Sequence, residues 1–524
     1  MKKLSLIISF CVFSLLNFAQ TPKNLTLLGS MTMPGGQSLA GCWHYNDGAG
    51  NEYALVGGAN GIAIVDITNP ATPNLLFQLP GATSLWHEIK VLGDYAYAVS
   101  EGNDPNGIKN GLQIIDLRYL PDSAPNKFYY GDGAIFNQLI TAHTVTAAGH
   151  YVYVNGHNIT ALGRGILILD VSDPWNPVYT GAIADNYCHD SYVRGDTIFS
   201  SEIYAGQFAI FDISDPTAPN QLATQSTPAL FNHNAWLSDD SRYLFVTDEK
   251  SNAPMTSYDV SDYNNITQID TFFNGNFTSH EVHNVRVFND YVLCPSYGSQ
   301  LTIVDASHPY NLIEVGNYTT GSSLCWDADP YTASGNIIAT DMNSGVLYIF
   351  GPTYMRACYL EGIVTDSLTG ISLNGVSVAL TSLGITASTN PSGNFATGYA
   401  DAGSYSVTFS KSGYVSKTVV VNLNNGSTTN LSVQLVPIGA GVNDLTELNV
   451  ILYPNPATTE LKISSPSRIE DCSIYDLTGK LVLRQNCSTA RNLSVNISTL
   501  AKGKYTLKLT GPDAAIYRTD FVKE

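Results

Sequence analysis

Charged residues are scarce in this chain, and basic residues are the scarcest of them. Only 13% of the 524 residues are charged, and 25 Lys and Arg face 44 Asp and Glu, which gives a net charge of −19. This excess of negative charge argues against nucleic acid and against anionic membrane surfaces as partners, because both repel an acidic protein. The many glycines (44) and tyrosines (31), without charged amphipathic segments, predict a mostly β protein with many turns.

Long apolar runs are also missing after the first residues of the chain. Lys2 and Lys3 precede the apolar run 4–18, and Ala19 follows it. A short basic segment, an apolar run and a small residue are the pattern of a secretory signal peptide, so we expect residues 1–19 to be removed after Ala19. No later run is long enough for a transmembrane helix, and the mature protein is therefore expected outside the cytoplasm.

Cysteines are few, and their number is odd once the signal segment is removed. Cys11 leaves with that segment, so seven of the eight cysteines remain and at least one has no partner. Export permits disulfides. Two pairs are candidates, with buried free thiols as the alternative for both: Cys472 with Cys487, and Cys42 with Cys325.

Familiar catalytic motifs are absent as well. The sequence contains no nucleophile elbow, no HExxH, no phosphate-binding loop and no CxxC. This absence favours a binding or scaffold role over catalysis. The alternative is an extracellular hydrolase or metal-dependent enzyme acting on polysaccharide or peptide, for which the many carboxylates would supply an acid and a base.

A degraded repeat fills the first two thirds of the chain, and residues 86–117 are its clearest copy. Each copy spans roughly 45 residues and contains about four short strands, which is typical of a β-propeller blade. The first marker is a His near the start of each copy, with Trp in the seventh: His44, His87, His143, His189, His233, His283 and Trp326. The second marker is an apolar strand that ends in Asp in six copies: Asp66, Asp116, Asp170, Asp212, Asp259 and Asp305.

Seven copies predict a seven-bladed propeller over residues 20–352. We expect the Asp markers to be structural, because an Asp side chain accepts hydrogen bonds from the backbone N–H groups of the turn that follows. The seventh copy stops near Pro352 without an outer strand, and residues 21–31 have the sequence of one. We therefore expect this N-terminal strand to complete the last blade and remove an exposed sheet edge.

The rest of the chain predicts two small β-sandwiches. Residues 357–436 contain short strands separated by Gly and Asn turns, residues 437–447 form a linker, and residues 448–524 contain a further set of strands. The predicted fold is thus all-β, a propeller followed by two sandwiches.

A candidate site lies where the first strands of the blades meet. Ring closure would bring imidazoles and carboxylates to one mouth of the channel, and such N and O ligands suit a divalent transition metal. The expected metal ligands are His87, His143, His189, His233, His283, Glu101 and Glu202. Four further carboxylates are expected to bind a polar ligand: Glu88, Asp190, Asp248 and Asp341.

The expected contacts follow from antiparallel pairing within a blade. Pairing sets His87 beside Glu101 and His189 beside Glu202, and it sets His233 near Asp248 or Glu249. The alternative is that each histidine is structural and forms hydrogen bonds within its own blade. A residue that recurs in nearly every blade is better explained by a structural role in each blade than by one central site.

Three resemblances follow from these residues. The repeat, with HEIKVLGDYAYA and the segment that follows it, resembles the LVIVD propeller repeat and the choice-of-anchor B family of exported proteins, which implies no particular activity. Residues 357–436 resemble the carboxypeptidase regulatory-like fold. The C-terminal domain resembles a type IX secretion sorting domain through YPNP (453–456), IYDLTGK (474–480), GKY (503–505) and FVK (521–523). That resemblance implies the type IX machinery as partner, removal of the domain, and release from the cell or lipopolysaccharide anchoring at its surface.

Overall fold

The computed structural model describes residues 22–103, 110–273, 281–298, 300–320, 324–438, 443–444, 450–511 and 516–524. The expected signal peptide and most of the expected linker lie outside these residues. Strands account for nearly all regular structure, which confirms the all-β prediction. The helical segments described are the short 3-10 turns η1 (Pro34–Gly36), η2 (Gly133–Ile135), η3 (Thr160–Leu162) and η4 (Thr381–Leu383). None of the described helical segments is long and apolar enough to span a bilayer.

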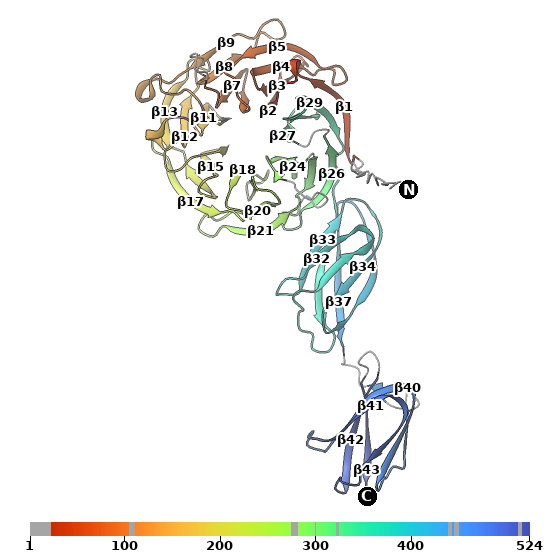
Figure 1. The fold of residues 1–524 in the computed structure, drawn as a ribbon. Coiled ribbons are helices and arrows are strands. Elements are labelled where there is room, and N and C mark those ends of the chain that lie inside the picture. The colour runs from red at the N-terminus through yellow and green to blue at the C-terminus, as the bar shows by residue number, and fades with distance from the viewer. Residues whose placement is uncertain are drawn as a thin grey trace, which may run out of the picture. The chain divides into compact units, whose positions relative to one another are not determined.

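Within the described residues, seven sheets follow one another between residues 25 and 352 and stand around a common axis (Figure 1). Five of them consist of four consecutive strands. The first holds β2 (Leu39–Asn46), β3 (Glu52–Gly58), β4 (Gly61–Asp66) and β5 (Asn74–Pro80). The second holds β6 (His87–Leu92), β7 (Tyr95–Ser100), β8 (Leu112–Asp116) and β9 (Asn126–Tyr129). The third holds β10 (Thr144–Ala148), β11 (Tyr151–Asn155), β12 (Ile166–Asp170) and β13 (Val178–Ile183).

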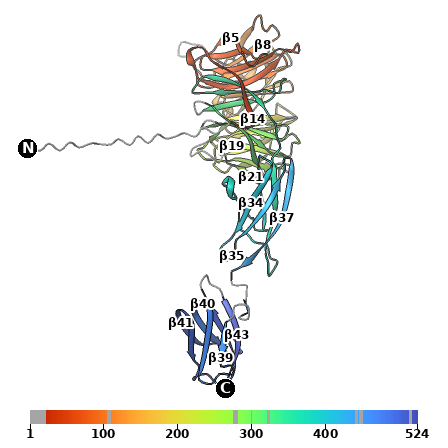
Figure 2. The same cartoon turned by 90° about the vertical axis from the view of Figure 1, so that its right-hand side faces the viewer.

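The fourth sheet holds β14 (Asp190–Arg194), β15 (Thr197–Glu202), β16 (Gln207–Asp212) and β17 (Asn220–Ser226). The fifth holds β18 (Asn232–Leu237), β19 (Tyr243–Asp248), β20 (Met255–Asp259) and β21 (Thr267–Phe272). The sixth has five strands, β22 (Glu281–Val282), β23 (Arg286–Phe288), β24 (Tyr291–Tyr297), β25 (Gln300–Asp305) and β26 (Ile313–Thr319). The first strand of each sheet lies nearest the axis in Figure 1, and Figure 2 shows the ring from its edge.

The seventh sheet joins the two ends of the ring. It holds β27 (Cys325–Asp329), β28 (Ile337–Asp341) and β29 (Val346–Pro352) from the end of the ring, and β1 (Leu25–Thr32) from its start. β1 pairs antiparallel with β29, from Leu25 opposite Pro352 to Thr32 opposite Val346. The backbone groups of β29 that would otherwise form a sheet edge are therefore bonded to β1.

Alternating apolar residues fill the spaces between neighbouring sheets. β3 is buried along its whole length, whereas the outer strand β17 is exposed at alternate positions. A buried strand packs both faces, which agrees with the runs of alternating aromatic and aliphatic residues in the sequence. One buried apolar cluster lies between each pair of neighbouring sheets, including the first and seventh, where Val56 and Leu347 belong to the same cluster.

The Asp markers have the structural role that the sequence predicts. In each of the six copies, the carboxylate accepts a hydrogen bond from the backbone N–H two residues further on, as Asp170 does from Ser172 at 2.7 Å. This bond closes the turn between the third and fourth strands of each sheet.

Two further groups of sheets follow the ring. The chain falls into two compact units: the first consists of residues 1–360, 397–403 and 422–429, and the second consists of the remaining residues. One sheet of the next region contains β30 (Cys358–Asp366), β33 (Asn394–Tyr399), β35 (Tyr414–Val415) and β37 (Ser427–Pro437). The other contains β31 (Ser377–Leu380), β32 (Ile385–Ser388), β34 (Gly403–Ser410) and β36 (Lys417–Leu423).

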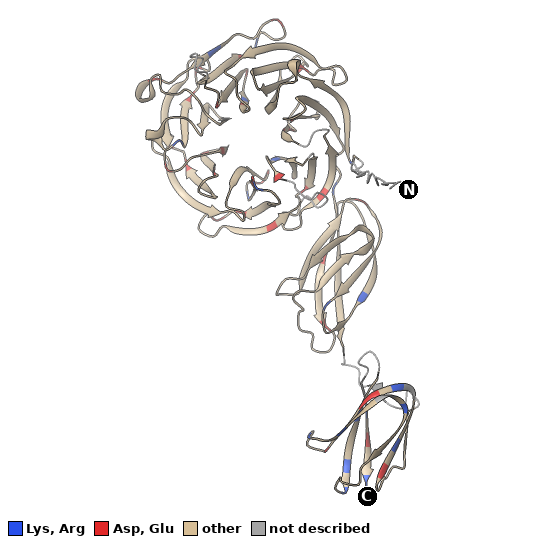
Figure 3. Ribbon diagram, viewed as in Figure 1, with Lys and Arg blue, Asp and Glu red and all other residues tan. Residues whose placement is uncertain are grey.

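The C-terminal region is one six-stranded sheet around its own apolar core. Its strands are β38 (Asn443–Asp444), β39 (Ile451–Tyr453), β40 (Glu460–Tyr475), β41 (Leu481–Asn496), β42 (Gly503–Thr510) and β43 (Ile516–Lys523). The long β40 pairs with β39 near its start and with β42 near its end. Figure 3 shows that these strands carry charged residues of both signs, whereas most strand residues of the ring are uncharged.

Neither candidate disulfide is formed. All seven cysteines outside the N-terminal segment are buried and free. Cys472, on β40, lies opposite Gln485 of β41 rather than opposite Cys487. The alternative of buried thiols therefore holds for both candidate pairs.

Candidate functional site

Four imidazoles and one indole form a continuous stack around the axis of the ring. We call His143, His189, His233, His283 and Trp326 the imidazole collar. His233 and Trp326 are the second residues of β18 and β27, His143 and His189 directly precede β10 and β14, and His283 lies between β22 and β23. The ring centroids of successive members lie 4.0, 4.2, 4.1 and 4.4 Å apart, and neighbouring planes are tilted by 48–57°. All five side chains are buried, so the prediction that distant imidazoles converge at the axis is correct for these blades.

One nitrogen of some collar histidines ties neighbouring sheets together. His189 Nδ1 lies 3.2 Å from the carbonyl oxygen of His233, and His283 Nδ1 lies 2.8 Å from that of Trp326. A ring that bonds through Nδ1 has a fixed orientation, and its Nε2 stays available. A structural role and a ligand role are therefore compatible, because they use different nitrogens.

A carboxylate from the fifth sheet faces the collar. Glu249 follows directly after β19, and its carboxylate oxygens lie 3.9 Å from His233 Nε2 and 3.8 Å from His283 Nε2. One ligand atom from each of His189, His233 and Glu249 lies within 4.8 Å of the other two. Ligand atoms around a tetrahedral zinc ion are about 3.5 Å apart, so a small inward movement would complete a His, His, Glu site.

Burial sets the protonation of this cluster. It holds the pKa of His189 and His233 well below that of free imidazole and lowers the pKa of His283 to about 3. Burial, with Glu281 nearby, also raises the pKa of Glu249 to about 7. The imidazoles are therefore neutral near pH 7, which is the form that binds metal.

Glu101 contacts a different histidine from the one expected. Antiparallel pairing sets His87 opposite Ser100, but the Glu101 carboxylate turns to the next sheet and lies 2.8 Å from His143 Nδ1. This bond lowers the pKa of Glu101. Glu101 is thus a partner of the collar rather than of His87.

His87, Glu202, Asp248 and Asp341 lie outside the collar. The His87 ring is buried beside Gly81, where a Cβ would approach Nε2 to 2.9 Å. Glu202 accepts hydrogen bonds from Asn186 and Gln207. Asp248 holds the loop before β18 through Thr227 and two backbone N–H groups, and Asp341 accepts a bond from the Ser344 N–H. These contacts correct the expectation that this histidine and these three carboxylates share one mouth with the other imidazoles.

Glu88 and Asp190 line the small cavity beside the collar. Glu88 Oε1 accepts a hydrogen bond of 3.0 Å from Trp326 Nε1, across the space left by Gly41, whose Cβ would lie 2.3 Å from the Glu88 carboxylate. Burial raises the pKa of Glu88 to about 7. Asp190 lines both the small cavity under the collar and a second, larger pocket.

Several residues at the axis were not selected from the sequence. Glu249 was named only as an alternative to Asp248. His44, which looked like a collar member, lies further along its strand and bonds to Asp329 at 2.7 Å. Five residues that line the larger pocket each follow a histidine marker by three positions: Lys90, Thr146, Tyr192, Trp236 and Arg286. This fixed spacing is the feature of the sequence that could have identified them.

Two histidines outside the collar should make the propeller less stable in acid. Burial lowers the pKa of His87 and of His157 to about 4. An unfolded chain protonates both near pH 6.5, so each contribution is complete above that pH and is lost as the pH falls toward 4. The free energy of unfolding should fall by up to about 1.4 kcal/mol per pH unit for each residue. Denaturant unfolding of the full chain between pH 7 and pH 4.5 measures this slope.

Variants at these positions separate the two contributions. His87→Gln and His157→Gln should each flatten the dependence on pH, even where they lower stability at pH 7. His150→Gln is the matched control, because it removes a histidine at an exposed position. An equal slope in all three variants would contradict the expectation.

Family comparisons agree with the three parts of the chain. Residues 49–79, 141–185, 204–227 and 281–320 match the LVIVD repeat, residues 359–436 match the carboxypeptidase regulatory-like domain, and residues 451–523 match the secretion system C-terminal sorting domain. The protein is therefore exported by type IX secretion to the cell surface or the medium. No curated protein matches the chain.

Three solved structures are similar to part of this chain at low sequence identity. A protein from Lactobacillus plantarum has a TM-score of 0.45 and 13% identity, over 59% of this chain and 89% of its own. The β-propeller domain of Cps50 (Swd1) from Myceliophteria thermophila has a TM-score of 0.43 and 12% identity, over 62% and 100%. A putative 6-phosphogluconolactonase from Bacteroides uniformis has a TM-score of 0.44 and 15% identity, over 64% and 95%.

Proposed function

We propose that this protein is an extracellular binding and scaffold protein whose propeller holds a transition-metal ion at the imidazole collar. The observation that carries the proposal is the cluster of His189, His233 and Glu249, whose ligand atoms lie within 4.8 Å of one another. Two neutral imidazoles and one carboxylate are a ligand set of Zn²⁺, and imidazole-rich sites also suit copper, iron and nickel.

Position and surroundings support a bound ion rather than a chance cluster. Nδ1 of His189 is held by a carbonyl oxygen, the usual arrangement for a metal-binding imidazole. His283 Nε2 is buried and has no hydrogen-bond partner among the described residues. A buried nitrogen without a partner costs free energy, and a nearby ion would remove part of that cost.

The other parts of the chain fit export and display. We infer that residues 1–19 direct passage across the inner membrane and that the sorting domain is removed after passage across the outer one. The carboxypeptidase regulatory-like domain then serves as a spacer, and the protein is released or held at the surface by lipopolysaccharide. Residues 20–436 would remain as the displayed portion.

Titration of Zn²⁺ into untagged, chelator-treated full-length protein tests the metal site. We expect one ion per chain, observed by calorimetry and as a higher melting temperature. Glu249→Gln removes a ligand charge with little change in shape and should weaken binding by 10-fold or more, roughly 1.4 kcal/mol. His233→Gln should do the same.

His87→Gln is the matched control, because its ring is buried near the axis but outside the collar. We expect it to bind Zn²⁺ as tightly as the natural chain does. Absence of stoichiometric binding, or equal losses in His87→Gln and Glu249→Gln, would refute the proposed metal site and leave the collar with its structural role.

A further inference from the structure

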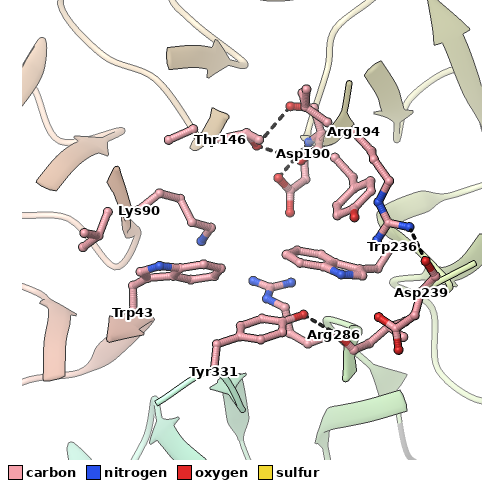
Figure 4. Close-up of a pocket in the computed structure, with 15 residues that line it drawn as sticks. Trp43, Lys90, Thr146, Asp190, Arg194, Trp236, Asp239, Arg286 and Tyr331 are labelled. Atoms are coloured by element: carbon pink, nitrogen blue, oxygen red, sulfur yellow. Dashed lines mark hydrogen bonds between the residues drawn. The ribbon is translucent and has the colours of Figure 1, made fainter. Parts of the chain in front are cut away.

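A second pocket opens at the axis, further along the innermost strands than the collar. Its volume is about 330 Å³, which is within the range of small-molecule sites. Figure 4 shows Trp43 and Trp236 on opposite sides of it, with the tips of Lys90, Asp190 and Arg286 pointing inward. Lys90 is three residues after His87, so the pocket lies about 10 Å along the strand from the level of the histidine markers.

Aromatic rings form the walls of this pocket. Trp236 stacks with Tyr331 at a centroid distance of 6.0 Å and an interplanar angle of 20°, and Tyr331 lies 5.9 Å from Trp43. Tyr331 is held in place by a hydrogen bond of 2.7 Å from its hydroxyl to the Val287 carbonyl. Rigid, half-buried aromatic faces favour a ligand with a flat apolar face.

Two buried cations lie against these walls. Lys90 Nζ is 4.6 Å from the Trp43 ring centroid, and the Arg286 guanidinium is 4.8 Å from that of Trp236. Both residues are at least nine-tenths buried. In a chain with 25 basic residues and a net charge of −19, two buried cations at one pocket are a distinctive feature.

Carboxylates lie near these cations, and Asp190 and Asp239 line the same pocket, but the donors of the two cations are not all bonded to them. Asp327 pairs with Arg286 at 3.0 Å, but Arg286 Nε is buried with no hydrogen-bond partner among the described residues. The carboxylate nearest to Lys90 is that of Glu88 at 3.8 Å, and burial raises its pKa to about 7. The nearest carboxylate to the buried Lys90 ammonium is thus beyond hydrogen-bond distance, which favours an additional acceptor from a ligand.

Asp190 supplies acceptors on the opposite side of the pocket. Its oxygens accept hydrogen bonds from Asn234 Nδ2 at 2.5 Å and from the Ser191 N–H at 2.7 Å, which fix the carboxylate. Each carboxylate oxygen can accept a further bond. Hydroxyl groups on a bound ring would therefore find an oriented acceptor.

We propose that this pocket binds a six-membered ring that carries a carboxylate, with the ring between Trp43 and Trp236 and the carboxylate on Lys90 and Arg286. Two sources supply this chemistry, an acidic sugar such as a uronate and an aromatic carboxylate. The acceptors of Asp190 suit the hydroxyl groups of the sugar.

Titration of full-length protein with sodium glucuronate, glucose and sodium benzoate at pH 7 tests this proposal. Tryptophan fluorescence and calorimetry report binding. We expect glucuronate to bind at least about 10-fold more tightly than glucose, because a charge-assisted hydrogen bond is lost with the carboxylate. Tighter binding of benzoate than of glucuronate would support the aromatic source, and binding of neither carboxylate would overturn the proposal.

Two lysines of the second sheet provide a matched pair of variants. Lys90→Met should weaken glucuronate binding about 10-fold or more. Lys127→Met removes a lysine that lies 4.9 Å from Trp175 outside the pocket, and it should leave binding unchanged. Equal effects of the two variants would overturn the proposal.

Trp43→Leu is a second pocket variant that removes a wall without removing a charge, and it should also weaken binding. Glucuronate binding at full strength in that variant would count against the proposed position of the ring. Binding should persist in Glu249→Gln and after treatment with a chelator, because neither changes the pocket. The proposed ring-binding pocket and the proposed metal site can therefore be tested independently of each other.

Discussion

Removal of residues 20–31 should lower the melting temperature of the propeller by about 10 °C or more. The deletion takes away most of β1, which pairs with seven residues of β29. At about 1 kcal/mol for each lost backbone hydrogen bond, the loss is several kcal/mol. It also exposes the edge of β29, where Leu347 and Ile349 are buried. Thermal unfolding followed by circular dichroism measures the effect.

Side-chain variants in β1 provide the control for this deletion. Thr26 and Ser30 are exposed, so Thr26→Ala with Ser30→Ala changes the side chains and keeps the backbone bonds. This double variant should melt within a few degrees of the natural chain. A deletion variant with an unchanged melting temperature would show that β1 contributes little to closing the ring.

Asp327→Ala should lower the free energy of unfolding by about 3–5 kcal/mol. The Asp327 side chain is fully buried, and its carboxylate lies 3.0 Å from Arg286 Nη2 and 3.1 Å from Asn284 Nδ2. Its removal leaves the Arg286 guanidinium charged and without its counter-charge. The cost of a buried, uncompensated charge exceeds the value of the bonds themselves.

A double-mutant cycle separates the cost of the uncompensated Arg286 charge from the loss of the hydrogen bonds that Asp327 accepts. Arg286→Met removes the charge and keeps much of the side-chain volume. Asp327→Ala combined with Arg286→Met should therefore be more stable than Asp327→Ala alone, as measured by denaturant unfolding. Additive losses in the double variant would mean that the two charges do not compensate each other.

Much of the fold was predictable because it depends on local patterns. Alternation of apolar residues, Asp-initiated turns and the missing outer strand of the last copy are all visible along the chain. The Asp markers illustrate this, since each carboxylate bonds two residues ahead in the chain. The disulfide candidates were less predictable, because the distance between Cys42 and Cys325 depends on how two sheets meet.

The site was predictable only in part. The repeat identified His143, His189, His233 and His283, because a residue at the same place in each blade faces the same axis. It misplaced His87 and two carboxylates: Glu101 bonds to His143 of the next sheet, and Glu202 bonds to Asn186 and Gln207 of its own blade, and neither direction can be read from the order of residues. Lys90, Trp236 and Arg286 occupy equivalent repeat positions but differ in chemistry, so no single motif marks the larger pocket.

The sequence by itself determined the all-β class, the repeat, the turns after each Asp and the route of export, since each depends on residues close together in the chain. Only the tertiary structure decided which groups meet at the axis: Glu249 with the imidazoles, Glu88 with Trp326, and two cations with two indoles. The physical reason is that these contacts join different sheets, so they depend on the angle and packing between blades rather than on the order of residues within one.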